Sequence, residues 1–230
     1  MSSPKILVVL TSHDKLGDTG KPTGWYLSEF SHPHHVFDQA SATLTVASPK
    51  GGAAPLDPSS VEAAKEDDVS VKFLNSQSQI WSNTSKVSEF LGKADEFDAI
   101  FYPGGHGPMY DLAVDEDSQK LIAEFWAKGK VVAAVCHGPA AFVNVKLADG
   151  KPLVDGKKLT AFSDAEEQQV GADKAVPFAL ETKLKEEGAK YEKAAEAWGE
   201  KVVVDGRLVT GQNPASAKGV GEAILKALKA

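Results

Sequence analysis

The chain has 230 residues, of which 42% are hydrophobic and 25% are charged, and its formal net charge is -7. This length and composition are typical of a folded domain with its own core, and they argue against disorder. The negative charge without a basic cluster argues against nucleic acid as a partner, and no apolar stretch approaches the length of a membrane span. The single cysteine excludes an internal disulfide, and the N-terminus lacks the pattern of a signal peptide. We therefore expect a cytoplasmic protein, with the nucleus as a further location.

The N-terminal part predicts a β-α-β unit. Residues 5–10 and 43–47 are typical of strands, and residues 24–37 between them can form a helix. Such a unit implies a right-handed crossover and a parallel pair of strands. Residues 53–95 then break the alternation, and within them we predict a helix over residues 86–91.

Residues 53–95 are interpreted as an insertion that caps the site or forms an interface, with a solvated excursion on the surface as the equal alternative. Strand character returns at residues 98–102. A helix over residues 118–128 then leads into the next strand, which predicts a second β-α-β unit.

Residues 131–135 are small or β-branched apolar residues without polar alternation, which predicts a strand buried on both faces in the middle of a parallel sheet. Gly138 permits a tight turn and Pro139 suits the first turn of a helix, so we expect Cys136 on a sharp strand-to-helix corner. We expect the N-terminus of that helix to favour the thiolate. A buried structural cysteine is the alternative. The adjacent His137 favours a nucleophile, because a ring that can carry charge gains nothing from a core.

The C-terminal part continues the α/β pattern. We predict, in chain order, a strand over residues 158–162, a capped acidic helix start at 163–167, a helix over 177–190, a hairpin over 201–210 and a helix over 215–228. No internal repeat or linker interrupts the chain, so we expect one domain over residues 1–230.

Glycines follow the strand predicted at residues 98–102. Gly104 and Gly105 allow backbone N–H groups to converge on an anion, and the N–H groups of Gly105 and His137 could together form an oxyanion hole. A plain β-α turn is the alternative. The spacing fits neither a phosphate loop nor a dinucleotide fingerprint, so phosphate binding is not favoured.

Carboxylates are candidates for a group that assists the thiol. Glu29 lies among aromatic residues of the first helix, and burial there would raise its pKa, so that the protonated carboxyl donates a hydrogen bond to a thiolate. Glu166 and Glu167 open a helix after a strand, where the helix dipole alone favours acidic residues. An exposed helical position is the alternative for Glu29.

Six histidines are candidates for acid-base chemistry or metal binding. His106 and His137 are predicted at the same edge of the sheet. His32, His34 and His35 form a suggestive cluster, but no cysteine pair lies nearby and a surface role is available to these rings, so we expect no metal site.

Four motifs carry a resemblance to a known family. They are Gly-Trp-Tyr-Leu-Ser-Glu at residues 24–29, Pro-Gly-Gly-His-Gly at 103–107, Ala-Val-Cys-His-Gly-Pro at 134–139 and Val-Thr-Gly-Gln-Asn-Pro-Ala-Ser at 209–216. With these motifs the chain resembles the DJ-1/PfpI superfamily, and within it the Hsp31-like branch of glutathione-independent glyoxalase III enzymes. The resemblance implies a flavodoxin-like α/β sandwich with a mostly parallel sheet and helices on both faces. It also implies a homodimer that converts methylglyoxal and water to D-lactate without a cofactor.

The resemblance further implies roles for individual residues. The matched positions are Cys136 as the nucleophile, His137 as the neighbouring acid/base, Glu29 as the carboxylate that hydrogen-bonds the cysteine, Gly105 as the oxyanion-hole glycine, and Glu167 as the acid that orients the histidine. Glu166 stays an alternative for that last role.

Rival functions differ in how well they fit the sequence. A class I glutamine amidotransferase shares the corner but needs a later histidine, and His137 is the last one. A PfpI-type peptidase relies on oligomer-completed sites, and residues 53–95 would restrict a peptide's access. An α/β-hydrolase would need Gly-x-Ser-x-Gly, which is absent. The resemblance also permits a holdase chaperone that binds unfolded client proteins, a cysteine redox sensor or a protein deglycase.

Overall fold

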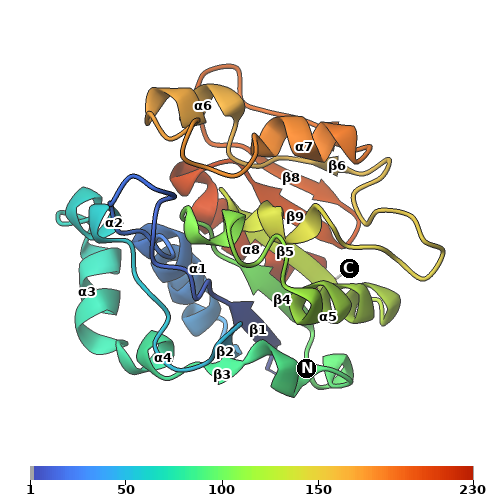
Figure 1. The fold of residues 1–230 in the computed structure, drawn as a ribbon. Coiled ribbons are helices and arrows are strands. Elements are labelled where there is room, and N and C mark those ends of the chain that lie inside the picture. The colour runs from blue at the N-terminus through green and yellow to red at the C-terminus, as the bar shows by residue number, and fades with distance from the viewer. Residues whose placement is uncertain (1–2, 230) are drawn as a thin grey trace.

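The computed structural model describes residues 3–229. Its main element is a seven-stranded sheet with the order β3-β2-β1-β4-β5-β9-β8, in which neighbouring strands are parallel except β8 and β9 (Figure 1). The strands are β1 (Lys5–Val9), β2 (Thr43–Ser48), β3 (Ser85–Lys86), β4 (Ala99–Tyr102), β5 (Val131–Val135), β8 (Val202–Asp205) and β9 (Leu208–Gly211). The predicted apolar strands at residues 5–10 and 131–135 are thus β1 and β5, in the interior of the sheet.

Helices cover both faces of this sheet. The helices α1 (Leu27–Gln39) and α8 (Ala217–Ala227) pack together on one face, and α5 (Glu116–Ala127) packs on the other (Figure 1). Side chains of β1 alternate accordingly. Ile6 and Val8 join the core cluster of α1 and α8, whereas Leu7 and Val9 join that of α5. Since both faces are buried from Ile6 onward, β1 is apolar after its exposed first residue, Lys5. The predicted α/β sandwich is confirmed.

The segment after β5 differs from the prediction. Instead of a longer helix beginning at Pro139, the chain forms the 3-10 helix η4 (Gly138–Phe142), all of whose residues are buried. So short a turn carries little of the aligned peptide dipole of an α-helix. The expectation that a helix N-terminus stabilises a thiolate at Cys136 is therefore wrong.

The C-terminal elements follow the prediction in part. The hairpin is β8 and β9, and α6 (Asp164–Gln169) begins with the capping box of Ser163 and Glu166. The strand predicted over residues 158–162 is only β6 (Lys158–Leu159), which pairs with β7 (Lys190–Tyr191) in a separate two-stranded sheet. It stops early because the Phe162 N–H donates to the Cys136 carbonyl oxygen instead. The helix predicted over 177–190 is limited to α7 (Leu180–Glu186).

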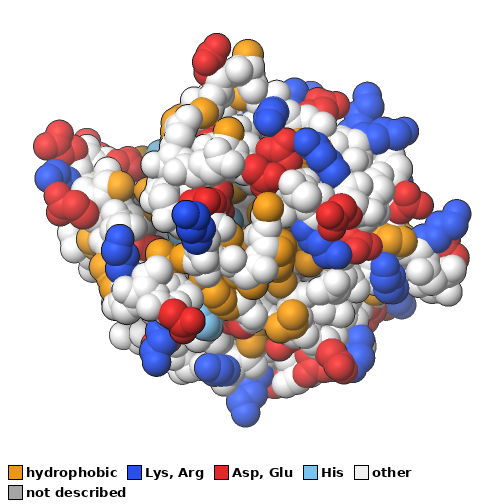
Figure 2. All heavy atoms as spheres, turned by 45° about the horizontal axis from the view of Figure 1, so that its top comes forward, with side chains coloured by type: hydrophobic (Ala, Val, Ile, Leu, Met, Phe, Trp, Pro, Cys, Tyr) orange, Lys and Arg blue, Asp and Glu red, His pale blue; other side chains and the backbone are white. Residues whose placement is uncertain are grey.

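The surface is mixed in charge. Lys and Arg side chains are interspersed with Asp and Glu over the face that Figure 2 shows. Within residues 3–229, none of the helices combines the length and the hydropathy needed to span a bilayer.

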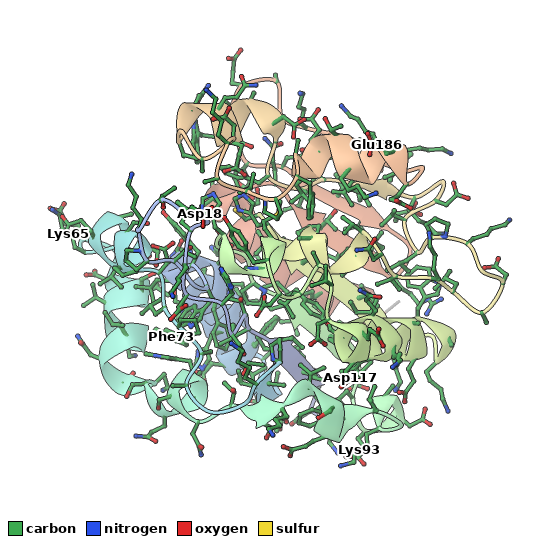
Figure 3. The ribbon with its side chains drawn as sticks, viewed as in Figure 1. Asp18, Lys65, Phe73, Lys93, Asp117 and Glu186 are labelled. Atoms are coloured by element: carbon green, nitrogen blue, oxygen red, sulfur yellow. The ribbon has the colours of Figure 1, made fainter. Side chains whose placement is uncertain are left out.

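Residues 53–95 form several short elements, some of which pack beside α1 and some beside α5. These are α2 (Pro58–Ala63), α3 (Asp68–Ser76), α4 (Gln79–Ser82), β3, and the 3-10 helices η1 (Val87–Phe90) and η2 (Ala94–Glu96). The helix predicted over residues 86–91 is wrong, because Lys86 pairs at the sheet edge and only η1 follows. Phe73 points inward from α3, with its ring centroid 5.2 Å from those of Phe30 and Trp81, whereas Lys65 points outward (Figure 3). Aromatic packing thus attaches the segment to α1.

Candidate active site

Cys136 lies where β5 ends, next to the end of β4. The strand β4 adjoins β1, and the strand order reverses between these two strands. Such switch points form ligand crevices in α/β sheets. Cys136 has a φ of 60°, which is unfavourable for a residue with a side chain. Its N–H donates to the Gly211 carbonyl oxygen at 2.9 Å, and its own carbonyl oxygen accepts the Phe162 N–H at 2.8 Å. Neighbouring segments therefore hold the strained corner.

Cys136, His137 and Glu167 form a hydrogen-bonded chain. The Cys136 Sγ and His137 Nδ1 atoms are 3.3 Å apart, and His137 Nε2 lies 2.6 Å from Glu167 Oε2. Because an ionised carboxylate only accepts, a neutral His137 carries its proton on Nε2 and leaves Nδ1 to accept the thiol proton. This is the geometry of a nucleophile, a base and an acid that orients the base.

The protonation states agree with that geometry. Burial lowers the pKa of His137, although the Glu167 charge opposes the shift. Burial acts against ionisation of Glu167, but the neighbouring histidines outweigh it and hold the pKa of this carboxyl well below its usual range. At neutral pH the pair is a neutral imidazole beside a carboxylate.

A second histidine shares the same carboxylate. His106 Nε2 lies 2.7 Å from Glu167 Oε1, and the His106 and His137 ring centroids are 4.3 Å apart. The sequence placed His106 at this edge of the sheet without a role. Its contact with Glu167 joins residues 61 positions apart, so no local pattern could have found it.

Glu29 reaches the site from α1. Its side chain is fully buried, and Oε2 accepts the Gly104 N–H at 2.8 Å. Burial raises the pKa of Glu29 to about 8, although the Cys136 thiol and the Gly104 N–H oppose the rise. Oε1 is buried and has no hydrogen bond of standard geometry within the described chain. The carboxyl is therefore protonated at neutral pH, and its O–H is available to the Cys136 sulfur.

The Cys136 thiol is also protonated in this state. Only 3% of the residue is exposed, and burial raises its pKa, which the charges of Glu29 and Glu167 raise further when these are ionised. The expectation of a resting thiolate is therefore wrong. A proton must leave the sulfur before it can react, and His137 Nδ1 is within reach to accept it.

Glu166 binds different partners from Glu167. It accepts hydrogen bonds from the backbone N–H groups of Ser163 and Trp198 and the side-chain amides of Gln212 and Asn213. Burial opposes its ionisation, but the hydrogen bonds outweigh burial and lower the pKa of Glu166. Gln212 and Asn213 belong to the motif at residues 209–216, so that motif anchors the start of α6. Of the two alternatives left by the sequence, Glu167 is the one that contacts the His137 ring.

The glycine corner after β4 lies against the Cys136 corner. Gly105 has a φ of 89°, and a Cβ there would collide with the Gly24 carbonyl oxygen, so only glycine fits. Neither the Gly105 N–H nor the His137 N–H donates a hydrogen bond to another group of residues 3–229. Both residues line the cavity that contains Cys136, and an oxyanion hole formed by these two N–H groups stays a prediction.

These groups line a cavity of about 320 Å³. Its polar lining includes Tyr26 and Asp57, which the sequence did not single out, and its apolar lining includes Phe162, Val170 and Trp198. Burial and the nearby Glu29 raise the pKa of Tyr26 to about 12, so its hydroxyl stays a donor. Asp57 precedes α2, and residues 53–95 therefore contribute to the cavity wall. Tyr26 belongs to the motif at residues 24–29, but only the fold brings it and Asp57 to Cys136.

Metal-ligand atoms converge at one place within the described chain. His106, His137 and Glu167 each offer an atom, and these lie within 4.8 Å of one another. The hydrogen bonds to Glu167 account for this closeness. His32 instead bonds Asp67 at 2.6 Å and His35 bonds Gln39 at 3.1 Å, so the histidines that cluster in the sequence do not converge.

Comparison with known proteins identifies the family of this chain. A model of the DJ-1/PfpI family matches residues 23–227. The chain belongs to the DJ-1/PfpI family. A relative in this family, the glutathione-independent glyoxalase HSP31 of Saccharomyces cerevisiae, is 34% identical over 100% of both chains.

Solved structures of the DJ-1/PfpI fold match closely as well. The Rapid Encystment Protein 24 kDa of Francisella tularensis is 38% identical, with a TM-score of 0.92 over 98% of this chain and 99% of its own. Glyoxalase III from Candida albicans is 31% identical, with a TM-score of 0.83 over 97% of each chain. The resemblance found in the sequence is confirmed.

Proposed function

We propose that this chain is a glutathione-independent glyoxalase, a lyase that converts methylglyoxal or a related small 2-oxoaldehyde and water to a 2-hydroxy acid, D-lactate in the case of methylglyoxal. The observation that carries the proposal is the Cys136 thiol 3.3 Å from the neutral His137 imidazole in a small-molecule cavity. The glyoxalase names of relatives similar over the full length support it. The scheme needs no metal or cofactor.

The first step is addition of the thiol to the aldehyde carbon. His137 Nδ1 takes the thiol proton as the S–C bond forms, and the ionised Glu167 stabilises the imidazolium. The aldehyde oxygen becomes an oxyanion, which the N–H groups of Gly105 and His137 stabilise. The imidazolium then returns its proton to this oxygen, which gives a neutral hemithioacetal.

The second step moves a proton between carbons. A base removes the proton from C1 while the C2 carbonyl oxygen gains one, which gives an enediol. Protonation of the enediol at C2, with loss of the proton from the C1 hydroxyl, then gives a thioester. Glu29, with a pKa of about 8, and His137 are the groups that exchange protons near neutral pH. One water then hydrolyses the thioester, which releases D-lactate and restores the thiol.

The assembly and location are proposed on the resemblance alone. We take the protein to be a cytoplasmic homodimer, and light scattering after gel filtration tests the oligomeric state.

The alternative functions have less support in the structure. A peroxide sensor needs an accessible thiolate of low pKa, whereas Cys136 is buried and its pKa is raised. A holdase needs a large exposed apolar patch, whereas the described chain has only four exposed large hydrophobic residues, Val114, Val170, Trp198 and Val204, and just two of them, Val170 and Trp198, line one cavity.

The test is to incubate the purified protein with methylglyoxal, without glutathione or metal, and to assay D-lactate beside the Cys136→Ala variant. We expect lactate from the wild type alone. Equal lactate formation by a folded Cys136→Ala protein would contradict the scheme, and no lactate from either protein would contradict the proposed function.

A further inference from the structure

Exposed hydrophobic side chains gather at the cavity of Cys136. Of the exposed large hydrophobic residues in the described chain, Val170 (47%) and Trp198 (43%) line this cavity, whereas Val114 and Val204 do not. Hydrophobic side chains also gather toward the middle of the face shown in Figure 2. Exposed apolar surface that lines a concave site is typical of a surface that binds an apolar group.

Trp198 is held in an unfavourable backbone conformation. Its φ of 67° is in the left-handed region, which large side chains avoid. Its N–H donates to Glu166 Oε1 at 2.8 Å, and its indole N–H donates to Gln169 Oε1 at 2.6 Å. The helix α6 therefore fixes both the backbone and the ring of Trp198. Strain that the surrounding structure maintains is concentrated at functional sites.

Aromatic rings connect Trp198 with the reacting groups. The Phe162 ring contacts that of Trp198 edge to face at a centroid distance of 5.5 Å, and it lies 4.4 Å from the His137 ring. All three rings line the cavity. A 2-oxoaldehyde joined to the Cys136 sulfur can therefore extend its substituent along Phe162 toward Trp198.

We infer that Phe162, Val170 and Trp198 form an apolar collar that selects 2-oxoaldehydes with a bulky apolar substituent, such as an aryl group, over methylglyoxal. This inference rests on the proposed function. The cavity of about 320 Å³ is in the range of sites for drug-sized ligands, roughly 300–1,000 Å³, and a methyl group leaves the collar unfilled. Contacts with the collar exist before and during the reaction, so they lower KM more than they raise kcat.

Steady-state kinetics with phenylglyoxal and methylglyoxal test the collar. We expect the wild type to have the higher kcat/KM for phenylglyoxal, and Trp198→Ala to lower the ratio of the two kcat/KM values about tenfold, mainly through the KM for phenylglyoxal. Trp198→Phe keeps an aromatic ring and should retain most of the preference. Val170→Ser, at an exposed position that makes little demand on folding, should reduce the ratio to a smaller extent.

The matched control is Val204→Ala, which removes an equally exposed hydrophobic side chain away from the cavity. We expect it to leave the ratio unchanged. If neither Trp198→Ala nor Val170→Ser changed the ratio of the two kcat/KM values, the collar would be overturned. It would also be overturned if Val204→Ala lowered this ratio as much as Trp198→Ala does.

A second measurement separates the collar from the proposed function. Cys136 is the single cysteine, and α-bromo ketones alkylate it as the sulfur displaces bromide and the thiol proton passes to His137. Mass spectrometry measures the rate at which each reagent alkylates Cys136, and this rate is divided by the rate of the same reagent with a free thiol. We expect this relative rate to be higher for phenacyl bromide than for bromoacetone. We expect Trp198→Ala to reduce the difference. If no lactate forms but the alkylation preference depends on Trp198, the proposed function fails and the collar stands. If lactate forms and neither preference depends on Trp198, the collar fails.

Discussion

Two regions of the site, the α1 side and the α6 side, each supply a carboxyl group near Cys136, yet the two groups differ in protonation. Glu29 on α1 and Glu167 on α6 are both buried, with 0% and 6% of each residue exposed. Glu29 accepts one backbone N–H, and its pKa is raised to about 8, whereas Glu167 accepts from two histidines, and its pKa is lowered. Since burial is similar, the difference in pKa comes from the number of hydrogen-bond donors and from the positive charge that a histidine beside Glu167 can carry. One carboxyl becomes a proton donor and the other a permanent anion.

The largest effect is expected from removing the charge on the α6 side. Glu167→Gln keeps the shape of the side chain but cannot hold His137 in its tautomer or stabilise its positive charge, so we expect kcat for methylglyoxal to fall about a thousandfold. Steady-state kinetics measure it, and Glu62→Gln, on the exposed surface of α2, is the control. A folded Glu167→Gln enzyme that keeps a tenth or more of the wild-type kcat would contradict the role of the anion.

The next effect is on stability and concerns the α1 side. The pKa of Glu29 rises from 4.5 to about 8 on folding, so its stabilising contribution is complete below pH 4.5 and is lost as the pH rises through 8. Glu29→Gln cannot ionise. Urea unfolding should therefore show that, between pH 5 and pH 9, the wild type loses about 4 kcal/mol of its free energy of unfolding relative to this variant. Parallel stability curves for the two proteins would show that Glu29 is not buried in its neutral form.

The pH dependence of kcat/KM tests the protonation states of His137 and Glu29. We expect the rate to rise as His137 loses its proton, at a pH below the usual histidine pKa, and to fall about tenfold per pH unit above 8 as Glu29 ionises. In Glu29→Gln the alkaline fall should disappear while the acidic rise stays. A wild-type profile that keeps rising above pH 8 would rule out a neutral Glu29 in the reaction.

The smallest effect is expected at the neighbour of Glu167. Glu166→Gln loses the charge that holds Ser163, Gln212 and Asn213, so we expect the free energy of unfolding to fall by about 2 kcal/mol and kcat to fall less than tenfold. Denaturant titration and kinetics on the same preparation measure both. If Glu166→Gln lost kcat as severely as Glu167→Gln, the assignment of an anchor and an orienting acid to these two residues would be reversed.

Local signals predicted most of the fold. The strands β1 and β5 were predicted because both faces of β5, and of β1 after Lys5, are buried and apolar. The capped helix start at residues 163–167 was predicted because the residues that form it are close in the chain. The errors at residues 86–91 and after Pro139 are short segments, where pairing at the sheet edge and core packing override helix propensity.

The sequence by itself determined the place of Cys136 at a strand end, its adjacency to His137 and the glycines that the corner requires, because each of these depends on residues next to one another in the chain. Only the tertiary structure decided that Glu167 binds His137, that His106 shares this carboxylate, and that the Cys136 thiol is protonated at rest. These properties depend on burial and on hydrogen bonds between distant segments, and burial and hydrogen bonds are what set a pKa.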